Sequence, residues 1–221
     1  MVGRNRKRPG VSPVSLALSI SLGLCVTGLG AYQLYQLDQT QLRNEILYPV
    51  TPKTLQAWLV TLDPEDAATA SRIAQRLLNM TLSQRRDAVL MMKQPAFFRQ
   101  LSTDYSRQRG FKAMVLKGVS DALAHAPALS DLWYLAASLR NNLFGFDQQV
   151  QRYLDLSFTY GPKEVDLVVA RLEMMSLAWS LLNDRSREIV RRDVQIVDQA
   201  YPARAGELRQ YLLKDGAKLD D

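Results

Sequence analysis

Cysteine and histidine are almost absent from this sequence of 221 residues, which contains one of each, Cys25 and His125. A single cysteine excludes an intramolecular disulfide framework, and the pair excludes a Cys/His zinc site and most Cys/His catalytic arrangements. Glycine-rich phosphate loops and the HExxH and GxSxG motifs are also missing. We therefore expect no metal, cofactor or catalytic residue, and predict that the chain is not an enzyme.

Positive charge is concentrated at the amino terminus. The formal net charge is +6, and Arg4, Arg6, Lys7 and Arg8 contribute +4 of it within ten residues that contain no acid. The rest of the chain has 24 basic and 22 acidic residues, which nearly balance. A nucleic-acid-binding domain needs basic residues spread along a face that follows the phosphates. We therefore expect no nucleic acid as a partner.

The longest stretch without a charged residue runs from Pro9 to Leu37. It is about long enough for a helix that crosses roughly 30 Å of hydrocarbon, and we predict a transmembrane helix over residues 11–35. Because basic residues precede this helix, the positive-inside rule places residues 1–10 in the cytoplasm as a tail. The prediction is a single-pass protein of the inner (cytoplasmic) membrane with a periplasmic domain. A cleaved secretory signal is the alternative.

Small side chains recur at every fourth position of the predicted transmembrane helix and share one of its faces. Helices in lipid associate through close packing of such residues, so the stripe predicts contact with the lipid-embedded part of a membrane protein subunit or with a second copy of this chain. Small residues are also common in transmembrane helices that have no partner, and both interpretations stay open. The stripe consists of Ser15, Ser19, Gly23, Thr27 and Ala31.

The remainder of the chain has apolar residues at helical spacing, and no stretch alternates apolar and polar residues long enough to indicate a sheet. We predict an all-α chain, with a stalk or linker over residues 36–50 and the first helices of a helical domain over residues 51–94. A series of helical repeats with a C-terminal capping helix is expected over residues 95–221.

Several helix starts are predicted from local sequence. Thr51 and Asp63 each precede a proline, and we expect both to cap a helix whose first turn contains that proline. Thr81 with Gln84 has the spacing of a capping box and indicates a helix that continues through the next two turns.

Two segments of the chain match each other at an offset of 35 residues. Gly110 and Gly145 lie 35 positions apart, and each lies 17 positions before a proline, Pro127 or Pro162. We interpret each interval as a glycine-containing turn, a helix, and a proline that separates this helix from the next. A pair of helices cannot bury its apolar face alone, so such units are expected to stack into a solenoid. Further matches are Lys117 with Arg152, Val119 with Leu154, Leu123 with Phe158, Ala126 with Gly161, and Asp131-Leu132 with Asp166-Leu167.

At these glycines and prolines the chain resembles the tetratricopeptide repeat, in which the second helix begins with a glycine and is followed by a proline at this spacing. The resemblance covers the second helices between about residues 95 and 202, whereas the first helices match poorly, because Trp133 falls two places late for the tryptophan of that family. It implies a tetratricopeptide-like helical-hairpin solenoid whose groove binds a protein partner.

A second resemblance comes from the run GPKEVDLVVARLEMMSLAWSLLNDRSREIVRRDV. This run is similar to the carboxy-terminal part of small single-pass, repeat-containing proteins of bacterial exopolysaccharide biosynthesis clusters. The quoted run has 34 residues and contains no catalytic motif, so the resemblance bears on the pathway and not on a mechanism.

Arg171 is expected on the apolar side of a helix from about residue 164 to residue 182. An unpaired buried charge costs several kcal/mol, so its guanidinium needs a carboxylate. An internal partner such as Asp131, Glu188 or Asp193 is one interpretation, and a carboxylate of a ligand or partner in the solenoid groove is the other.

A basic run follows on the next predicted helix, where Glu188 is placed to pair with Arg192. Such a run is commonly a solvated face, but it is also a candidate surface for anionic lipid, an acidic glycan or an acidic protein. Together with Arg171, the candidate partner-binding residues are Arg185, Arg187, Arg191 and Arg192.

These features favour a membrane-anchored, non-enzymatic scaffold that contacts the lipid bilayer and a membrane protein subunit and binds a protein partner in an envelope assembly of polysaccharide synthesis or export. A homo-oligomer is also compatible with the sequence. The alternatives are an assembly or quality-control factor for a membrane complex, for example at the mitochondrial inner membrane, and an enzyme that acts on glycan through groove carboxylates.

Overall fold

The computed structural model describes residues 51–66 and 68–214, all of which belong to one compact unit that spans Pro49–Asp221. The predicted cytoplasmic tail, transmembrane helix with its small-residue stripe, and stalk lie outside the described residues. Within the described residues, no helix is both long and apolar enough to cross a bilayer.

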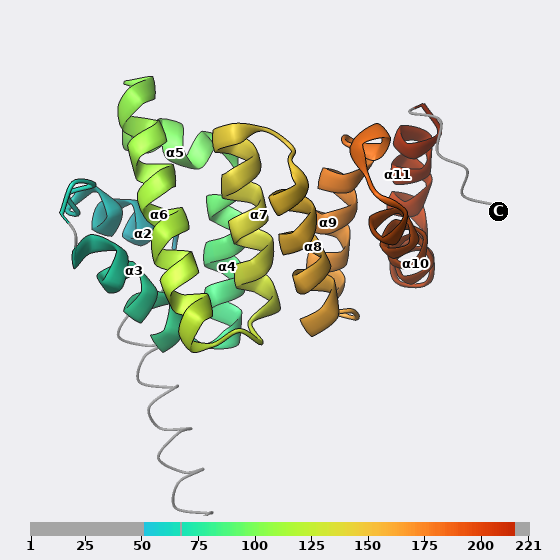
Figure 1. Ribbon diagram of the computed structural model, residues 1–221, viewed down its shortest axis with the longest axis horizontal. Helices are drawn as coiled ribbons and strands as arrows, with labels where there is room; N and C mark the ends of the chain where they lie inside the picture. The colour runs from blue at the N-terminus through green and yellow to red at the C-terminus, as the bar shows by residue number, and fades with distance from the viewer. Residues whose placement is uncertain (1–50, 67, 215–221) are drawn as a thin grey trace, which may run out of the picture. The chain divides into compact units, whose positions relative to one another are not determined.

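All regular structure in the described residues is helical, as the sequence predicts (Figure 1). Short connections join consecutive helices, and a single 3₁₀ turn, η1, precedes α10. The helices are α2 (Pro52–Val60), α3 (Ala68–Asn79), α4 (Leu82–Met92), α5 (Pro95–Leu101), α6 (Tyr105–His125), α7 (Ser130–Phe144), α8 (Gln148–Tyr160), α9 (Val165–Ser176), η1 (Trp179–Leu181), α10 (Asp184–Ala200) and α11 (Pro202–Lys214).

Two of the three predicted helix starts are confirmed. Thr51 caps α2 and Thr81 caps α4, each through a complete capping box. The third prediction is wrong, because α3 begins at Ala68 and not at the proline after Asp63. Asp63 instead accepts a hydrogen bond from the Glu65 N–H at 2.9 Å within a turn, and its carbonyl accepts one from the Thr69 hydroxyl at 2.8 Å.

The helices pack in two rows. In one row α4 contacts α7, α7 contacts α9, and α9 contacts α11, while α8 contacts α10 in the other (Figure 1). From α4 onward most consecutive helices also pack against each other, most extensively α7 with α8, and α3 lies along α6. One continuous apolar core lies between them and includes Phe111, Val115, Leu132, Leu135, Leu154 and Leu167.

The connections that contain Pro127 and Pro162 have the same backbone conformation. Ala126 ends α6 at φ −137° and ψ 73°, and Gly161 ends α8 at φ −140° and ψ 59°. The residues before the next helices also agree, with φ −84° and ψ 92° at Leu129 and φ −79° and ψ 93° at Glu164. The 35-residue offset of the sequence is therefore an offset in local structure at these connections.

The two glycines of the same intervals differ in their structural positions. Gly145 ends α7 at φ +84°, a conformation that L side chains avoid, so the turn requires glycine there. Gly110 lies inside α6 instead of in a turn, because Asp104 caps this helix and Ser102 to Asp104 form the connection before it. The expectation that both glycines mark turns is correct for Gly145 and wrong for Gly110.

Candidate functional site

Arg171 is fully buried with an internal partner. Its Nε donates to Oδ2 of Asp193 at 2.9 Å and its Nη2 donates to Oδ1 at 3.1 Å, while Nη1 donates to the carbonyl of Gly161 at 3.2 Å. Both side chains are 0% exposed. Burial raises the pKa of Asp193, and the hydrogen bonds from Arg171 oppose that rise. Arg171 therefore braces the end of α8 against α9 and α10, and it has no surface at which a partner could contact it.

A second buried pair was missed in the sequence. Nε of Arg85 on α4 donates to Oδ2 of Asp131 on α7 at 2.6 Å, and both side chains are buried. Burial raises the pKa of Asp131, while the charge of Arg85 opposes the rise. The sequence contained a sign of this burial, because Arg85 lies on the same helical face as Ala88, Val89 and Met92, which are buried.

The arginines of the basic run each have a carboxylate within 3.6 Å. Arg192 pairs with Glu188 at 3.2 Å, as the spacing predicts, and Arg191 approaches the same carboxylate at 3.6 Å. The remaining two pairs are Arg185 with Asp155 at 3.5 Å and Arg187 with Asp184 at 3.6 Å. The run is consequently a surface of alternating charge and not an uncompensated basic patch.

The connection between α9 and α10 exposes two leucines. Leu177 is 76% exposed and Leu181 is 58% exposed, whereas Trp179 and Leu182 in the same segment are buried. The Trp179 ring also lies 5.7 Å from the guanidinium of Arg187. Burial of Trp179 and Leu182 fixes this short segment to the core and leaves Leu177 and Leu181 on the surface. The helix predicted to continue to residue 182 ends at Ser176, and no sequence pattern indicated this pair.

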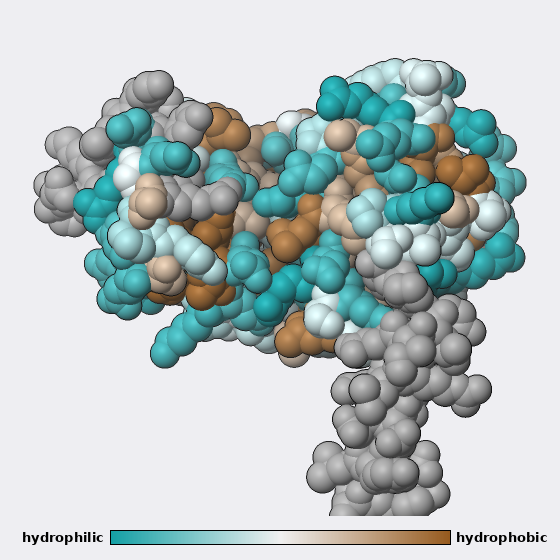
Figure 2. All heavy atoms as spheres, turned by 180° about the vertical axis from the view of Figure 1, so that it is seen from behind, coloured by the Kyte–Doolittle hydropathy of each residue, from teal (hydrophilic) through white to brown (hydrophobic). Residues whose placement is uncertain are grey.

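Figure 2 shows one face of the molecule, on which the apolar residues form separate patches between hydrophilic ones and not one continuous band.

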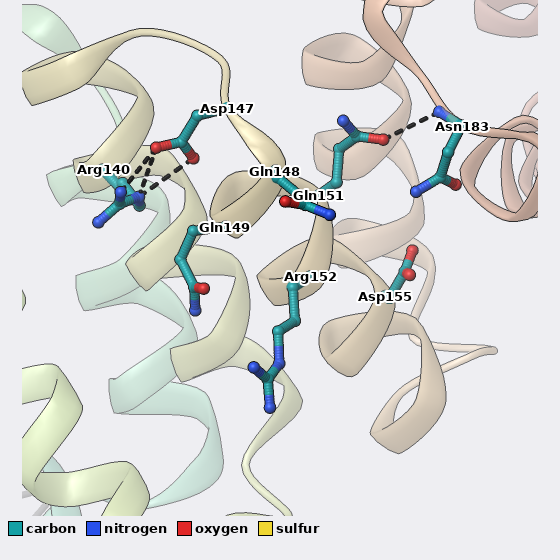
Figure 3. A pocket seen from close by; sticks show the side chains of 8 residues that line it. All are labelled: Arg140, Asp147, Gln148, Gln149, Gln151, Arg152, Asp155 and Asn183. Atoms are coloured by element: carbon teal, nitrogen blue, oxygen red, sulfur yellow. Dashed lines mark hydrogen bonds and ion pairs between the residues drawn. The ribbon is translucent and has the colours of Figure 1, made fainter.

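A polar pocket of about 550 Å³ lies where the end of α7, the first turns of α8 and the start of α10 meet (Figure 3). Its walls contain amide, guanidinium and carboxylate groups and no aliphatic or aromatic side chain. The lining residues are Arg140, Asp147, Gln148, Gln149, Gln151, Arg152, Asp155 and Asn183.

Part of this lining is fixed by contacts within the protein. Nε and Nη2 of Arg140 bind the Asp147 carboxylate at 2.6–3.1 Å, and Asp147 also caps α8 by accepting from the Val150 N–H at 2.8 Å. The hydrogen bonds that Arg140 donates hold the pKa of Asp147 below its usual value, and the same hydrogen bonds raise the pKa of Arg140. Gln151 accepts from the Asn183 N–H at 2.9 Å and donates to the Leu181 carbonyl at 3.1 Å.

Asp155 closes the pocket on the side of α10. Its Oδ1 accepts from the Ser186 hydroxyl at 3.2 Å, and its Oδ2 lies 3.5 Å from Nε of Arg185. Burial raises the pKa of Asp155, while the Ser186 hydrogen bond and the Arg185 charge lower it. Asp155 therefore links α8 to the first turn of α10.

Three lining residues have free side chains. In the part of the chain that the structure describes, the side chains of Gln148, Gln149 and Arg152 have no hydrogen bond or ion pair to another residue. The described residues also contain no group of three or more His, Cys, Asp or Glu side chains that could hold a metal ion. The pocket can thus supply hydrogen bonds and one unpaired positive charge to a ligand.

No protein family model, no curated protein and no solved structure matches this chain. What the described residues define is therefore an all-α class of protein with two rows of packed helices.

Proposed function

We propose that this chain is a non-enzymatic scaffold, anchored in the inner membrane by residues 11–35, whose tetratricopeptide-like helical unit binds a protein partner in an envelope assembly of polysaccharide synthesis or export. Stacked helices provide an extended surface for a partner. The anchor confines the search for that partner to the membrane. The resemblance at residues 161–194 is the reason for choosing this pathway.

The exposed pair Leu177 and Leu181 is the observation that carries the proposal. Both leucines are exposed within one short segment, and the buried Trp179 in the same segment holds it to the core. The guanidinium of Arg187 lies 5.7 Å from the Trp179 ring and so places a charge beside this segment, as at the polar rim of many protein interfaces. The repeated geometry at Pro127 and Pro162 supports the stacking of helical units that this surface requires.

Co-purification tests the proposal. The full-length chain, its double variant Leu177→Ser/Leu181→Ser and a control variant, Leu82→Ser, are purified from detergent extracts of the source cells. Leu82 is 53% exposed at the start of α4, so it controls for loss of one surface leucine. We expect the double variant to lose a protein that accompanies both wild type and control. The same set of proteins with all three chains would contradict the proposed surface.

A second experiment addresses the membrane segment. Replacing Gly23 with a bulky residue should weaken recruitment of a membrane subunit, because small residues permit close helix packing. Unchanged co-purification of membrane proteins would remove this part of the proposal without affecting the leucine surface.

A further inference from the structure

The polar pocket at the start of α8 has the construction of a ligand site. Its volume of about 550 Å³ falls within the range of about 300–1,000 Å³ typical of small-molecule sites. The wall is fixed by the Arg140–Asp147 pair, by Gln151 with Asn183, and by Asp155 with Ser186. These pairs hold the shape of the pocket around the side chains that remain free.

The free side chains of the pocket indicate which chemical groups a ligand should have. Gln148 and Gln149 each offer two N–H donors and one acceptor oxygen, and Arg152 offers a planar set of donors. Figure 3 shows all three side chains projecting from the first turns of α8. Alternating donors and acceptors suit hydroxyl groups, since each hydroxyl both donates and accepts. An apolar ligand would find no aliphatic or aromatic side chain among the lining residues.

The charges in the pocket determine what net charge the ligand should have. Arg140 is neutralised by Asp147, and Asp155 is neutralised by Arg185 next to the pocket. Arg152 remains as an unpaired cation. A ligand with a single carboxylate would satisfy it, whereas a highly charged anion would meet the carboxylates of Asp147 and Asp155.

We propose that this pocket binds an acidic saccharide, with Arg152 on the carboxylate of a uronate unit and Gln148 and Gln149 on neighbouring hydroxyls. An extended peptide is the less suitable occupant, because its side chains would find no apolar contact in the lining. Saccharide recognition goes beyond the scaffold role and does not use the exposed side chains of Leu177 and Leu181.

Titration with defined disaccharides tests the assignment. The full-length chain, in a detergent without a sugar head group, is titrated with cellobiouronic acid, which has one carboxylate, and with cellobiose, which has none. Binding is followed by ligand NMR. We expect the acid to bind about tenfold more tightly, because a charge-assisted pair with Arg152 is lost in cellobiose. Equal affinity for the two disaccharides would overturn the role of Arg152, and no saturable binding of either would overturn the site.

Variants locate the binding. Arg152→Met should weaken the binding of cellobiouronic acid by about tenfold and leave the binding of cellobiose nearly unchanged, because Arg152 is assigned to the carboxylate that cellobiose lacks. The double variant Gln148→Leu/Gln149→Leu should weaken the binding of both disaccharides. The matched control is Arg72→Met, which removes an exposed arginine of α3 outside the pocket and should leave both affinities unchanged. Equal losses in Arg152→Met and Arg72→Met would show nonspecific attraction and overturn the proposal.

A peptide probe separates saccharide from protein ligands. The blocked tripeptide acetyl-Gly-Glu-Gly-amide has the same single carboxylate without sugar hydroxyls. Weaker binding than cellobiouronic acid is expected, and equal or tighter binding would overturn the saccharide assignment. Because Arg152 is exposed and unpaired, its substitution should leave the circular dichroism spectrum and the melting temperature of the chain unchanged. Failure of the leucine variants to release a protein partner would leave these measurements unaffected.

Discussion

The segments 110–127 and 145–162 match in sequence, but their structures agree only at the carboxyl ends. Their carboxyl ends are equivalent, because Ala126 and Gly161 end their helices with nearly the same φ and ψ. Their amino ends differ, since Gly145 ends a helix and Gly110 lies inside one. The comparison shows that a proline fixes a connection more reliably than a glycine does: proline cannot continue the helix, whereas glycine is tolerated both in a helix and in a turn.

The end of the second segment is held by a buried ion pair that the first segment lacks. Arg171 binds the carbonyl of Gly161 and the carboxylate of Asp193, whereas no arginine among the described residues donates to the carbonyl of Ala126. The nearest counterpart is Arg85, which binds Asp131 at the start of α7. The same backbone conformation is thus supported by different side chains.

Removing the Arg171–Asp193 ion pair should have the largest effect on stability. Asp193→Ala leaves the buried Arg171 guanidinium uncompensated and should lower the free energy of unfolding by about 3–5 kcal/mol. Glu188→Ala, which removes the exposed partner of Arg192, should cost less than about 1 kcal/mol. Urea denaturation followed by circular dichroism measures both. Equal losses would mean that the buried pair has no special role.

Substituting the two glycines should give effects of opposite sign. Gly145→Ala forces a side chain to φ +84° and should cost about 1–3 kcal/mol. Gly110→Ala should stabilise by about 0.5–1 kcal/mol, because alanine favours a helix interior. The nearest atom to an added Cβ at Gly110 is the Pro64 Cβ at 3.9 Å, an ordinary contact. If Gly110→Ala destabilised as much as Gly145→Ala, the two positions would be equivalent after all.

The equivalent helix ends should also respond differently. An added Cβ at Gly161 would lie 2.6 Å from the Ser130 Cβ, so Gly161→Ala should cost about 1–3 kcal/mol through overpacking. Ala126→Gly removes a methyl group from a position that tolerates alanine, and should cost less than about 1 kcal/mol. Thermal denaturation of both variants is the measurement. A fully tolerated Gly161→Ala would mean that the connections do not pack closely on each other.

The smallest expected effect is electrostatic and concerns Asp147, which follows Gly145 in the second segment only. Because Arg140 lowers its pKa, the stability that Asp147 contributes is present above its unfolded-state pKa and is lost as the pH falls through the lower folded-state value. Arg140→Met should raise the pKa of Asp147 towards its usual range. Carboxyl NMR titration of both chains measures this, and an identical Asp147 pKa in each would disprove the pairing in solution.

The sequence predicted the helical class, the cap at Thr51 and the capping box at Thr81, because these depend on residues three or four positions apart. It also located the equivalent proline connections. It placed Arg171 on an apolar face and included Asp193 among three possible partners, but could not choose among them, since the choice depends on how α9 packs on α10. The position of Gly110 was wrong because the start of α6 was set by Asp104 and not by the glycine.

The polar pocket and the exposed leucine pair were invisible in the sequence for a related reason. The pocket lining comes from the end of α7, the start of α8 and Asn183, which is more than 30 positions from Arg140. The leucine pair depends on which neighbours in one short segment are buried. By itself, the sequence determined the helical class, the caps and the proline connections, since these are local properties of the chain. Only the tertiary structure decided which charges are paired, which polar groups stay free and which leucines reach the surface, because these depend on contacts between helices distant in sequence.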